Sequence, residues 1–216
     1  MEQEILTNDQ KLVLKAVVGE PRLAGFYLSG GTVLANYYLY HRFSDDLDFF
    51  TRADVDSTFL REFAEKLKKD LRAKSFRFER RHDRNQFFFE LGEGELKLEF
   101  TRYPFRQLED PNSRDGILVD SLRDIAANKL LALLDRFDPK DFVDLYFILK
   151  KRDILEIRAD VQEKFGHKVG SIFLAGELAK VRRIEALPKM LKPLTVQALK
   201  DFFADLIKKL SPDVFD

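Results

Sequence analysis

The sequence contains no cysteine, which excludes a disulfide framework, a thiolate metal site and a cysteine nucleophile. It contains no tryptophan and only 2 methionines, so aromatic packing depends mainly on 21 phenylalanines, which carry no hydrogen-bonding group. The chain also has no net charge, because 37 lysines and arginines balance 37 aspartates and glutamates. A surface for nucleic acid or membrane would therefore have to be a local feature.

Long apolar runs are missing as well, since none approaches the roughly 20 residues of a membrane span. The first ten residues, MEQEILTNDQ, lack the basic start and the apolar core of a signal peptide. We therefore expect a cytoplasmic protein with no membrane partner. The 3 histidines, at positions 41, 82 and 167, do not have the spacing of zinc ligands. With 216 residues, of which 45% are hydrophobic, the chain can form one generous domain or two small lobes.

The spacing of apolar residues predicts alternating strands and helices in the first half of the chain. Helices are expected over residues 8–19, 32–41 and 58–71, and strands at 25–28, 47–51, 75–80, 86–91 and 95–102. A glycine turn, Ser29-Gly30-Gly31, joins the first strand to the second helix. From Ser121 onward the pattern is only helical, beginning with SLRDIAANKLLALLDRF and a further helix that Asp138-Pro139 starts.

The chain is expected to divide near residues 105–120, where the segment PFRQLEDPNSRDG is polar and rich in turn residues. The sequence thus predicts an α+β protein: a mixed β-sheet flanked by helices in an α/β lobe at residues 1–118, and an all-helical C-terminal lobe at residues 119–216.

Two carboxylates, Asp46 and Asp48, fall at the start of the second strand. Residues two apart in a strand share a face, and their Cα atoms are about 6.6 Å apart, so both side chains can reach one cation. Carboxylates beside apolar Leu47 and Phe49 are costly unless they are neutralised, and Mg²⁺ is commonly held by one or two carboxylates together with substrate phosphates. The alternative is a solvated strand end.

The glycine turn offers groups that could bind an anion. Glycines between a strand and a helix let the backbone N–H groups of Gly30 and Gly31 approach a phosphate at the positive end of the helix, with the Ser29 hydroxyl as a further donor. The alternative is a tight turn that only needs positive φ. The order of the two motifs favours a binding site over these structural alternatives, because consecutive strands would place a triphosphate and its Mg²⁺ at one edge of the sheet.

A two-metal site generally needs a third carboxylate on a neighbouring strand, and Glu99 is the candidate. In the segment GELKLEF the apolar and polar residues alternate, so Lys97 and Glu99 share the face opposite the core. The alternative is an exposed glutamate on a half-solvated strand.

Residues 29–48, SGGTVLANYYLYHRFSDDLD, closely resemble the first motif of the AbiEii/AbiGii nucleotidyltransferase-like toxins, a branch of the polymerase β-type nucleotidyltransferase superfamily. A later segment, DIAANKL through Arg136 and KDFVDLY, is similar to the helical motif of that family. The resemblance spans about two-thirds of the chain and implies a nucleotidyltransferase-like sheet with a helical second lobe.

The resemblance also implies roles for individual residues. Ser29, Gly30 and Gly31 would bind the triphosphate, and Asp46 and Asp48 would hold Mg²⁺. Lys129 would contact the nucleotide phosphates, and Asp144 or Asp141 would complete the active site. The same motif includes three nucleotide-binding candidates of less defined role: Thr32, Arg42 and Ser44. Many polymerase β-type enzymes use aspartate as the third carboxylate, and Glu99 in its place could be a metal ligand or a general base.

The charged residues of the helical segment are also compatible with a purely structural role. Lys129 and Arg136 are seven residues apart and so lie on one helix face, where charge is usually only solvated. Asp138 and Asp141 suit the cap and the first turn of a helix. Lys140 and Asp144 form an i, i+4 pair in the less favourable order.

The predicted reaction transfers a nucleoside monophosphate from an NTP to an acceptor hydroxyl. Residues 61–84 contain ten lysines or arginines against five aspartates or glutamates. This excess of positive charge is suited to binding RNA, and the alternative is an ordinary solvated surface. Related toxins modify tRNA 3′ ends and have a cognate antitoxin, so the resemblance makes tRNA the leading acceptor. Two alternatives are an aminoglycoside-type small acceptor and a non-catalytic nucleotide-binding module that acts through a partner.

Overall fold

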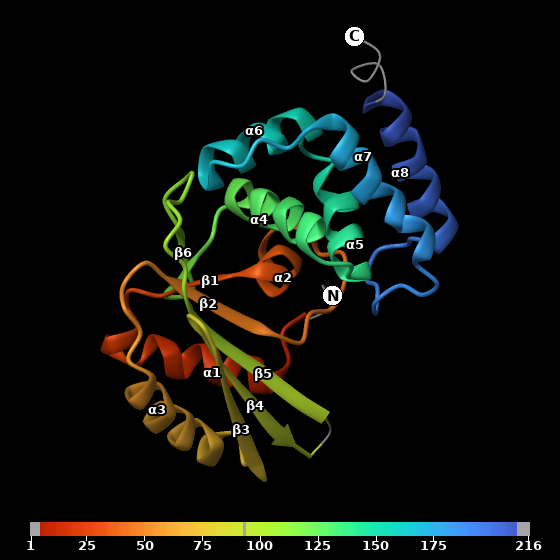
Figure 1. Ribbon diagram of the computed structural model, residues 1–216. Coiled ribbons are helices and arrows are strands. Elements are labelled where there is room, and N and C mark those ends of the chain that lie inside the picture. The colour runs from red at the N-terminus through yellow and green to blue at the C-terminus, as the bar shows by residue number, and fades with distance from the viewer. Residues whose placement is uncertain (1–4, 93, 211–216) are drawn as a thin grey trace. The chain divides into compact units, whose positions relative to one another are not determined.

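The computed structural model describes residues 5–92 and 94–210, and it confirms the expected α+β class (Figure 1). Its strands are β1 (Tyr27–Ser29), β2 (Leu47–Thr51), β3 (Ser75–Arg81), β4 (Arg84–Leu91), β5 (Gly94–Arg102), β6 (Asn112–Arg114) and β7 (Ile117–Val119). Its α-helices are α1 (Asn8–Val18), α2 (Gly30–Val33), α3 (Ser57–Asp70), α4 (Leu122–Asp135), α5 (Pro139–Ile148), α6 (Ile154–Phe165), α7 (Ser171–Ala179) and α8 (Val196–Leu210).

The chain forms two compact units that are not simple halves. The first consists of residues 1–36, 44–106 and 110–121, and the second of residues 37–43, 107–109 and 122–216. The short segment 37–43 therefore belongs to the second unit, although the residues on both sides of it belong to the first.

The first unit is built on one mixed sheet with the strand order β3-β4-β5-β2-β1-β7-β6. β1 runs antiparallel to β2 and parallel to β7, and β2 runs parallel to β5. Alternation along β5 buries Leu96, Leu98 and Phe100 on one face and turns Lys97 and Glu99 to the other. The sheet thus has an apolar face and a face that carries charged side chains.

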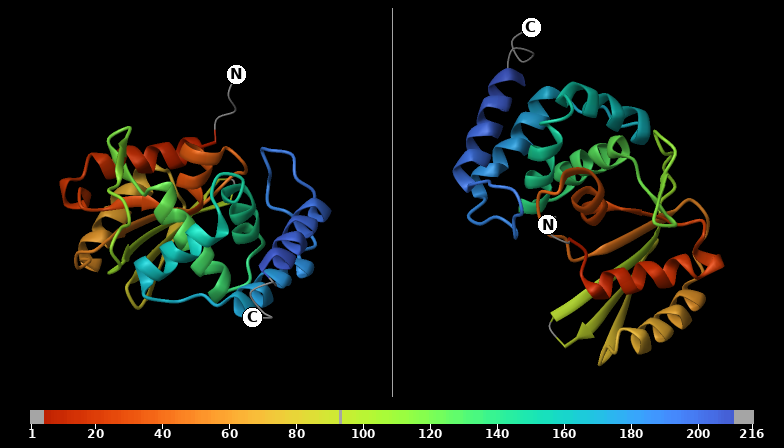
Figure 2. Two further views of the ribbon diagram at one scale, coloured as in Figure 1. Left: turned by 90° about the horizontal axis from the view of Figure 1, so that it is seen from above. Right: turned by 180° about the vertical axis from the view of Figure 1, so that it is seen from behind.

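Helices α1 and α3 lie on the same side of the sheet (Figures 1 and 2). The α3 ring of Phe63 meets the β5 ring of Phe100 edge-on, with the ring centroids 6.2 Å apart. α3 begins where the Asp56 carboxylate accepts hydrogen bonds from two backbone N–H groups, which makes Asp56 its N-cap residue. The two helices therefore cover the apolar face with their buried stripes.

The structure differs from the expectations in two places. The helix expected over residues 32–41 instead begins at Gly30 as α2 and continues as a π-helical stretch, Leu34–Leu39. The segment 105–120, for which the sequence indicated turns and no strand was predicted, contains β6 and β7. Each of these strands has three residues. β7 is stabilised by pairing with β1, and beside this pairing the Asp120 N–H donates a 2.9 Å bond to the Leu28 carbonyl. Such distant pairing leaves no periodic pattern in a short segment.

The second unit is helical, as predicted. α4 packs against α5, α6 and α7, and α7 packs against α8. Phe142 of α5 and Phe203 of α8 are both buried and meet edge-on, with ring centroids 5.5 Å apart. α6 ends at Gly166, whose φ of 69° is the left-handed conformation typical of a helix C-cap. No helix in residues 5–92 and 94–210 has both the length and the apolar character needed to cross a membrane.

Candidate active site

A row of polar residues crosses four adjacent strands on the charged face of the sheet. Ser29 of β1 lies opposite Asp48 of β2, and Asp48 lies opposite Glu99 of β5. Glu99 in turn lies opposite Gln86 of β4. Side chains directly opposite one another share a face and have Cβ atoms about 5 Å apart. The register therefore brings the glycine turn, one aspartate and the glutamate into line, although the third of these is 70 residues from the first in sequence.

The glycine turn lies against Asp48, one of the two aspartates. Gly30 has a φ of 75°, in the left-handed region that disfavours residues with a Cβ atom. A Cβ at Gly30 would lie 2.8 Å from Oδ2 of Asp48. Gly30 and Gly31 are the first residues of α2, so their N–H groups lie at the positive end of a helical segment. Glycine is thus required at position 30 both by its φ and by the closeness of the carboxylate.

A lysine occupies the space between the three carboxylates. The Lys97 Nζ lies 3.6 Å from Oδ2 of Asp46 and 3.6 Å from Oδ1 of Asp48. It lies 3.2 Å from Oε2 of Glu99. Burial lowers the pKa of the Lys97 ammonium, but the charges of the three carboxylates outweigh burial and raise this pKa above its ordinary value. Both aspartates therefore point toward one cationic group.

Glu99 is buried and its two oxygens are fully engaged. Arg84 donates to both of them, from Nε to Oε1 at 2.6 Å and from Nη2 to Oε2 at 2.8 Å. The Thr101 hydroxyl donates to Oε1 at 2.7 Å, and the Gln86 amide donates to Oε2 at 2.8 Å. Burial raises the pKa of Glu99, but the Arg84 hydrogen bond and the Lys97 charge lower it to about 2. A carboxylate with this pKa is a poor general base near neutral pH.

The donor set fits one Mg²⁺ ion held by two carboxylates. Asp46 and Asp48 already converge on the Lys97 ammonium, with side chains 41% and 22% exposed, and Mg²⁺ usually keeps one or two carboxylates plus substrate phosphates and water. In the part of the chain that the structure describes, no group of three or more acidic or histidine side chains forms a ready metal site. Glu99 therefore fits a metal less well than the aspartate pair, since its oxygens already accept four hydrogen bonds.

The remaining predicted residues of this unit make contacts at the glycine turn and in the loop before β2. The Ser29 hydroxyl, predicted as a phosphate donor, donates to Oδ2 of Asp120 at 2.7 Å and is buried. The Thr32 hydroxyl donates to the backbone carbonyl of Asp46. The carbonyl of Ser44 accepts a bond from the Gln10 amide at 2.8 Å. The Thr32 and Ser44 contacts fix the backbone that leads to the aspartates, and the Ser29 contact joins the end of β1 to the residue after β7. Binding of a nucleotide by these three residues remains a prediction.

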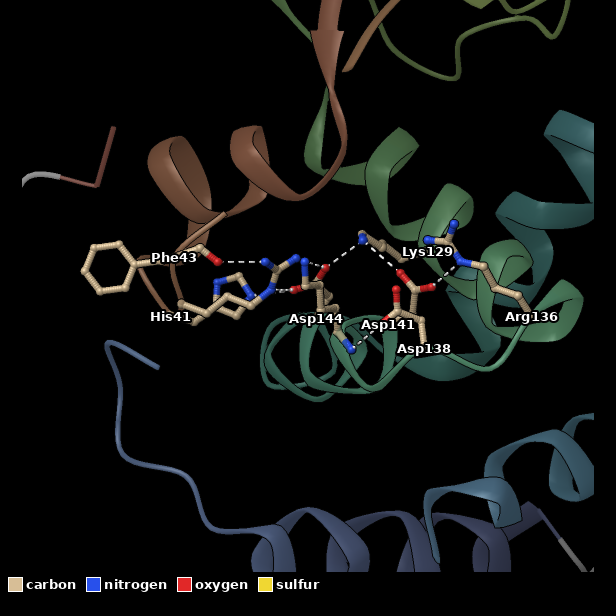
Figure 3. Close-up of polar contacts among 9 residues, drawn as sticks. His41, Phe43, Lys129, Arg136, Asp138, Asp141 and Asp144 are labelled. Carbon is tan, nitrogen blue, oxygen red and sulfur yellow. Dashed lines mark hydrogen bonds and ion pairs between the residues drawn. The ribbon is translucent and has the colours of Figure 1, made fainter. Parts of the chain in front are cut away.

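The other predicted residues lie together in the second unit, around Asp144 (Figure 3). Arg42 binds this carboxylate with two parallel bonds, from Nε to Oδ1 at 2.6 Å and from Nη2 to Oδ2 at 2.8 Å. The Lys129 Nζ lies 2.7 Å from the same Oδ2, and the His41 Nε2 lies 2.7 Å from Oδ1. All four residues are buried. The segment 37–43 is therefore held to the helices of its unit by a buried ion network.

Asp141 extends this network toward the surface. Its Oδ1 accepts a bond from the Lys129 Nζ at 2.9 Å, and its Oδ2 accepts one from the Arg136 Nε at 2.9 Å (Figure 3). Asp138 caps α5 by accepting from the N–H of Lys140, as the sequence predicted. These partners account for the burial of Asp141 and Asp144 without a nucleotide. The active-site roles that the resemblance implied for Lys129, Asp141 and Asp144 remain predictions.

The charges of the network set the protonation of its members. Burial raises the pKa of Asp144, but the Lys129 and Arg42 cations outweigh burial and lower this pKa well below its usual range. For His41, burial dominates and lowers the pKa, although Asp144 opposes it. Since a carboxylate only accepts, the His41 Nε2 is the donor, and the Nδ1 is a buried atom with no hydrogen-bond partner among the described residues. His41 is therefore neutral near physiological pH.

Sequence reasoning did not assign Lys97, Arg84 or Asp120 to the site. Alternation along β5 placed Lys97 on the correct face, and this was the one signal available. The contacts of Arg84 with Glu99 and of Ser29 with Asp120 depend on pairing between strands that the sequence pattern does not specify.

Comparison with known proteins agrees with the resemblance. An uncharacterized protein of Aquifex aeolicus (strain VF5), aq_aa25, is 33% identical over 166 residues, which cover 74% of this chain and 76% of the relative. JHP933 from Helicobacter pylori has a similar structure, with a TM-score of 0.56 and 20% identity, over 96% of this chain and 94% of that chain. MenT4, the nucleotidyltransferase toxin Rv2826c of Mycobacterium tuberculosis H37Rv, has a TM-score of 0.50 and 17% identity, over 94% of this chain and 84% of that chain.

These two structures show that the fold is shared. The family is shown by a match to the family model of the nucleotidyl transferase AbiEii toxins of type IV toxin–antitoxin systems, which covers residues 13–216. The chain therefore belongs to the AbiEii toxin family, and the protein is a nucleotidyltransferase.

Proposed function

We propose that the protein is a Mg²⁺-dependent enzyme that moves a nucleoside monophosphate from an NTP to a hydroxyl of RNA, at the 3′ end of tRNA. One observation carries the proposal: Gly30 lies against Asp48, and Asp46 and Asp48 both point at the Lys97 cation. Phosphate donors and two carboxylates thus share one side of the sheet, as a nucleotide with a bound metal requires.

The chemistry is a phosphoryl transfer. The acceptor oxygen forms a bond to the α-phosphorus of the NTP while the bond from that phosphorus to the bridging oxygen of the β-phosphate breaks, and pyrophosphate leaves. The hydroxyl proton passes to water, because Glu99 with a pKa of about 2 is not suited to accept it. Bound Mg²⁺ would supply charge stabilisation and a lowered pKa for the acceptor hydroxyl.

The residues of this chain contribute positioning and charge. The N–H groups of Gly30 and Gly31 bind the phosphates, and Asp46 and Asp48 hold the metal. Lys97 neutralises these carboxylates when the site contains no metal. With Mg²⁺ on the aspartates, the Lys97 ammonium would be available to the leaving pyrophosphate, where negative charge develops.

Basic residues beside the site favour RNA as the acceptor. Apart from Arg80, which lies on the opposite face of the sheet, the β3–β4 region, residues 72–90, contains five lysines or arginines against three aspartates or glutamates. A local positive surface of this kind suits a phosphate backbone, although the whole chain has no net charge. The competing acceptor is a small hydroxylated molecule of the aminoglycoside type, for which this basic surface would be unnecessary.

The family match supports a biological setting of the same kind. As a toxin of a type IV system, the protein would act in the cytoplasm and have a cognate antitoxin.

The test is to incubate the protein with Mg²⁺, each of the four labelled NTPs, and either total tRNA or a panel of aminoglycosides. We expect label from at least one NTP to enter tRNA. Asp48→Asn should abolish the transfer and keep the fold, because it removes one carboxylate charge from a side chain of the same shape.

The matched control is Asp54→Asn, which changes an exposed aspartate of the same unit, with a 96% exposed side chain. It should transfer like the wild type. Wild-type transfer by Asp48→Asn would overturn the site assignment, and label entering only the aminoglycosides would overturn RNA as the acceptor.

A further inference from the structure

An aromatic ring, Phe88 of β4, lies on the charged face of the sheet. Its neighbours Phe87 and Phe89 point the other way and are fully buried in the core. Phe88 is half-buried, and it lies opposite Arg77 of β3 and opposite Lys97 of β5. Residues directly opposite one another share a face, so the ring lies on the face that carries the site. The apolar core does not account for an aromatic residue at this position.

A guanidinium group is layered on this ring. The Arg77 Cζ lies 4.1 Å from the centroid of Phe88, within the range of a cation–π contact. The Arg77 side chain is 55% exposed. Glu79 is shared by Arg77 and Arg81, so these three side chains keep a net positive charge. Phe88 is therefore a partly accessible ring with positive charge around it.

The ring is close to the aspartates. β4 is separated from β2 only by β5, and two strand spacings amount to about 10 Å. Stacked nucleotides rise about 3.4 Å each along a strand, so about three nucleotides span this separation. A strand whose terminal hydroxyl lies at the aspartates would bring one of its last bases to Phe88.

We propose that Phe88 and Arg77 form a stacking platform for a base near the single-stranded 3′ end of the acceptor RNA. The inference rests on the proposed function. The Arg77 guanidinium, layered on the Phe88 ring, offers a flat surface on which a base of any sequence can stack, and its charge lies beside the adjoining phosphates. The platform therefore selects an unpaired RNA end over a small acceptor, without reading its sequence.

The test measures binding of a fluorescent single-stranded RNA and of total tRNA in the absence of NTP and Mg²⁺, so that catalysis plays no part. Phe88→Leu keeps the apolar volume and removes the ring, and it should raise the Kd for both RNAs about tenfold, as expected for the loss of one stacked base. Phe88→Trp keeps a π face and should bind like the wild type, which shows that the position tolerates change without loss of the fold.

The chain offers a matched control on the opposite face of the same strand pair. Phe78 of β3 is also half-buried, and its ring lies under a guanidinium, with the Arg61 Cζ 4.3 Å from its centroid. Phe78→Leu should leave the Kd unchanged. Arg77→Gln should reduce the slope of log Kd against log salt by about one, whereas Arg80→Gln, on the opposite face, should not.

The outcomes separate the platform from the function. If the wild type labels tRNA and Phe88→Leu binds RNA normally, the platform is wrong and the proposed function stands. If Phe88→Leu weakens NTP binding and leaves RNA binding intact, the ring holds the nucleotide substrate and the inference is overturned. If the wild type binds no RNA and labels only small acceptors, both the platform and the RNA acceptor are overturned.

Discussion

Replacing Lys97 by methionine should tighten Mg²⁺ binding. The ammonium lies between 3.2 and 3.6 Å from oxygens of Asp46, Asp48 and Glu99. A Mg²⁺ ion that binds there must displace the ammonium, or its binding is weakened by repulsion from it. At about 3.5 Å, one pair of unit charges interacts by about 1 kcal/mol at the dielectric constant of water and by about 5 kcal/mol at an effective value near 20.

The interaction energy lies near the low end of this range, because water reaches all three side chains: Lys97 is 20% exposed, and the two aspartates are 41% and 22% exposed. We expect a net gain of about 1.4 kcal/mol in Mg²⁺ binding, which is a tenfold lower Kd. Without metal, Lys97→Met should unfold about 2–4 °C below the wild type, since about 1 kcal/mol of charge neutralisation is lost. Saturating Mg²⁺ should remove most of this difference in unfolding temperature.

The assay is calorimetric titration with MgCl₂, with thermal unfolding followed over the same concentrations. Lys74→Met is the matched control, because Lys74 is 67% exposed and pairs only with Glu90 at 3.7 Å among the ion pairs of the described residues. It should change neither quantity. An unchanged or higher Kd in Lys97→Met would refute the reasoning that Lys97 and the metal compete for the same carboxylates.

Three further predictions follow from the geometry. Gly30→Ala should destabilise the protein by about 2 kcal/mol in urea unfolding, because an L-residue resists a φ of 75°, and it should weaken Mg²⁺ binding, because the new Cβ would lie 2.8 Å from Oδ2 of Asp48. Asp144→Asn should cost about 3–5 kcal/mol in urea unfolding, since it leaves buried cations without their counter-charge; a loss below about 1 kcal/mol would contradict the network. His41 has a lowered pKa in the folded state, so stability should fall as the pH drops below about 6.5, by up to about 1.4 kcal/mol per unit. Urea titrations of His41→Gln should show less of this dependence than those of wild type or of His82→Gln.

The elements that the sequence predicted are those with a local signal. α1 and α3 have apolar stripes and capping residues, and β2 was predicted with the bounds that it has, Leu47–Thr51. β6 and β7 were missed because each has three residues, and their formation depends on partners elsewhere in the chain. The π-helical stretch after α2 was missed because its residues carry an ordinary helical pattern.

The same distinction holds for the site. The glycine turn and the aspartates lie within 20 residues of sequence, so their order along the chain indicated that they belong together. The position of Lys97 among the carboxylates requires the parallel register of β2 and β5, which no local pattern specifies. The Arg42–Asp144 contact joins residues 102 positions apart, and a contact over that separation leaves no mark in the local pattern around either residue.

The path of the chain through the two units limits how the protein can be dissected. A fragment of residues 122–216 would contain Asp144 but would lack His41 and Arg42, two of its buried partners. It would expose the carboxylate and the helix surfaces that segment 37–43 covers, and residues 1–121 would keep this segment without the helices that bind it. Neither piece should fold alone, and the helical unit should not be exchangeable between relatives as a C-terminal module. Unfolding of the whole protein should then be a single cooperative transition.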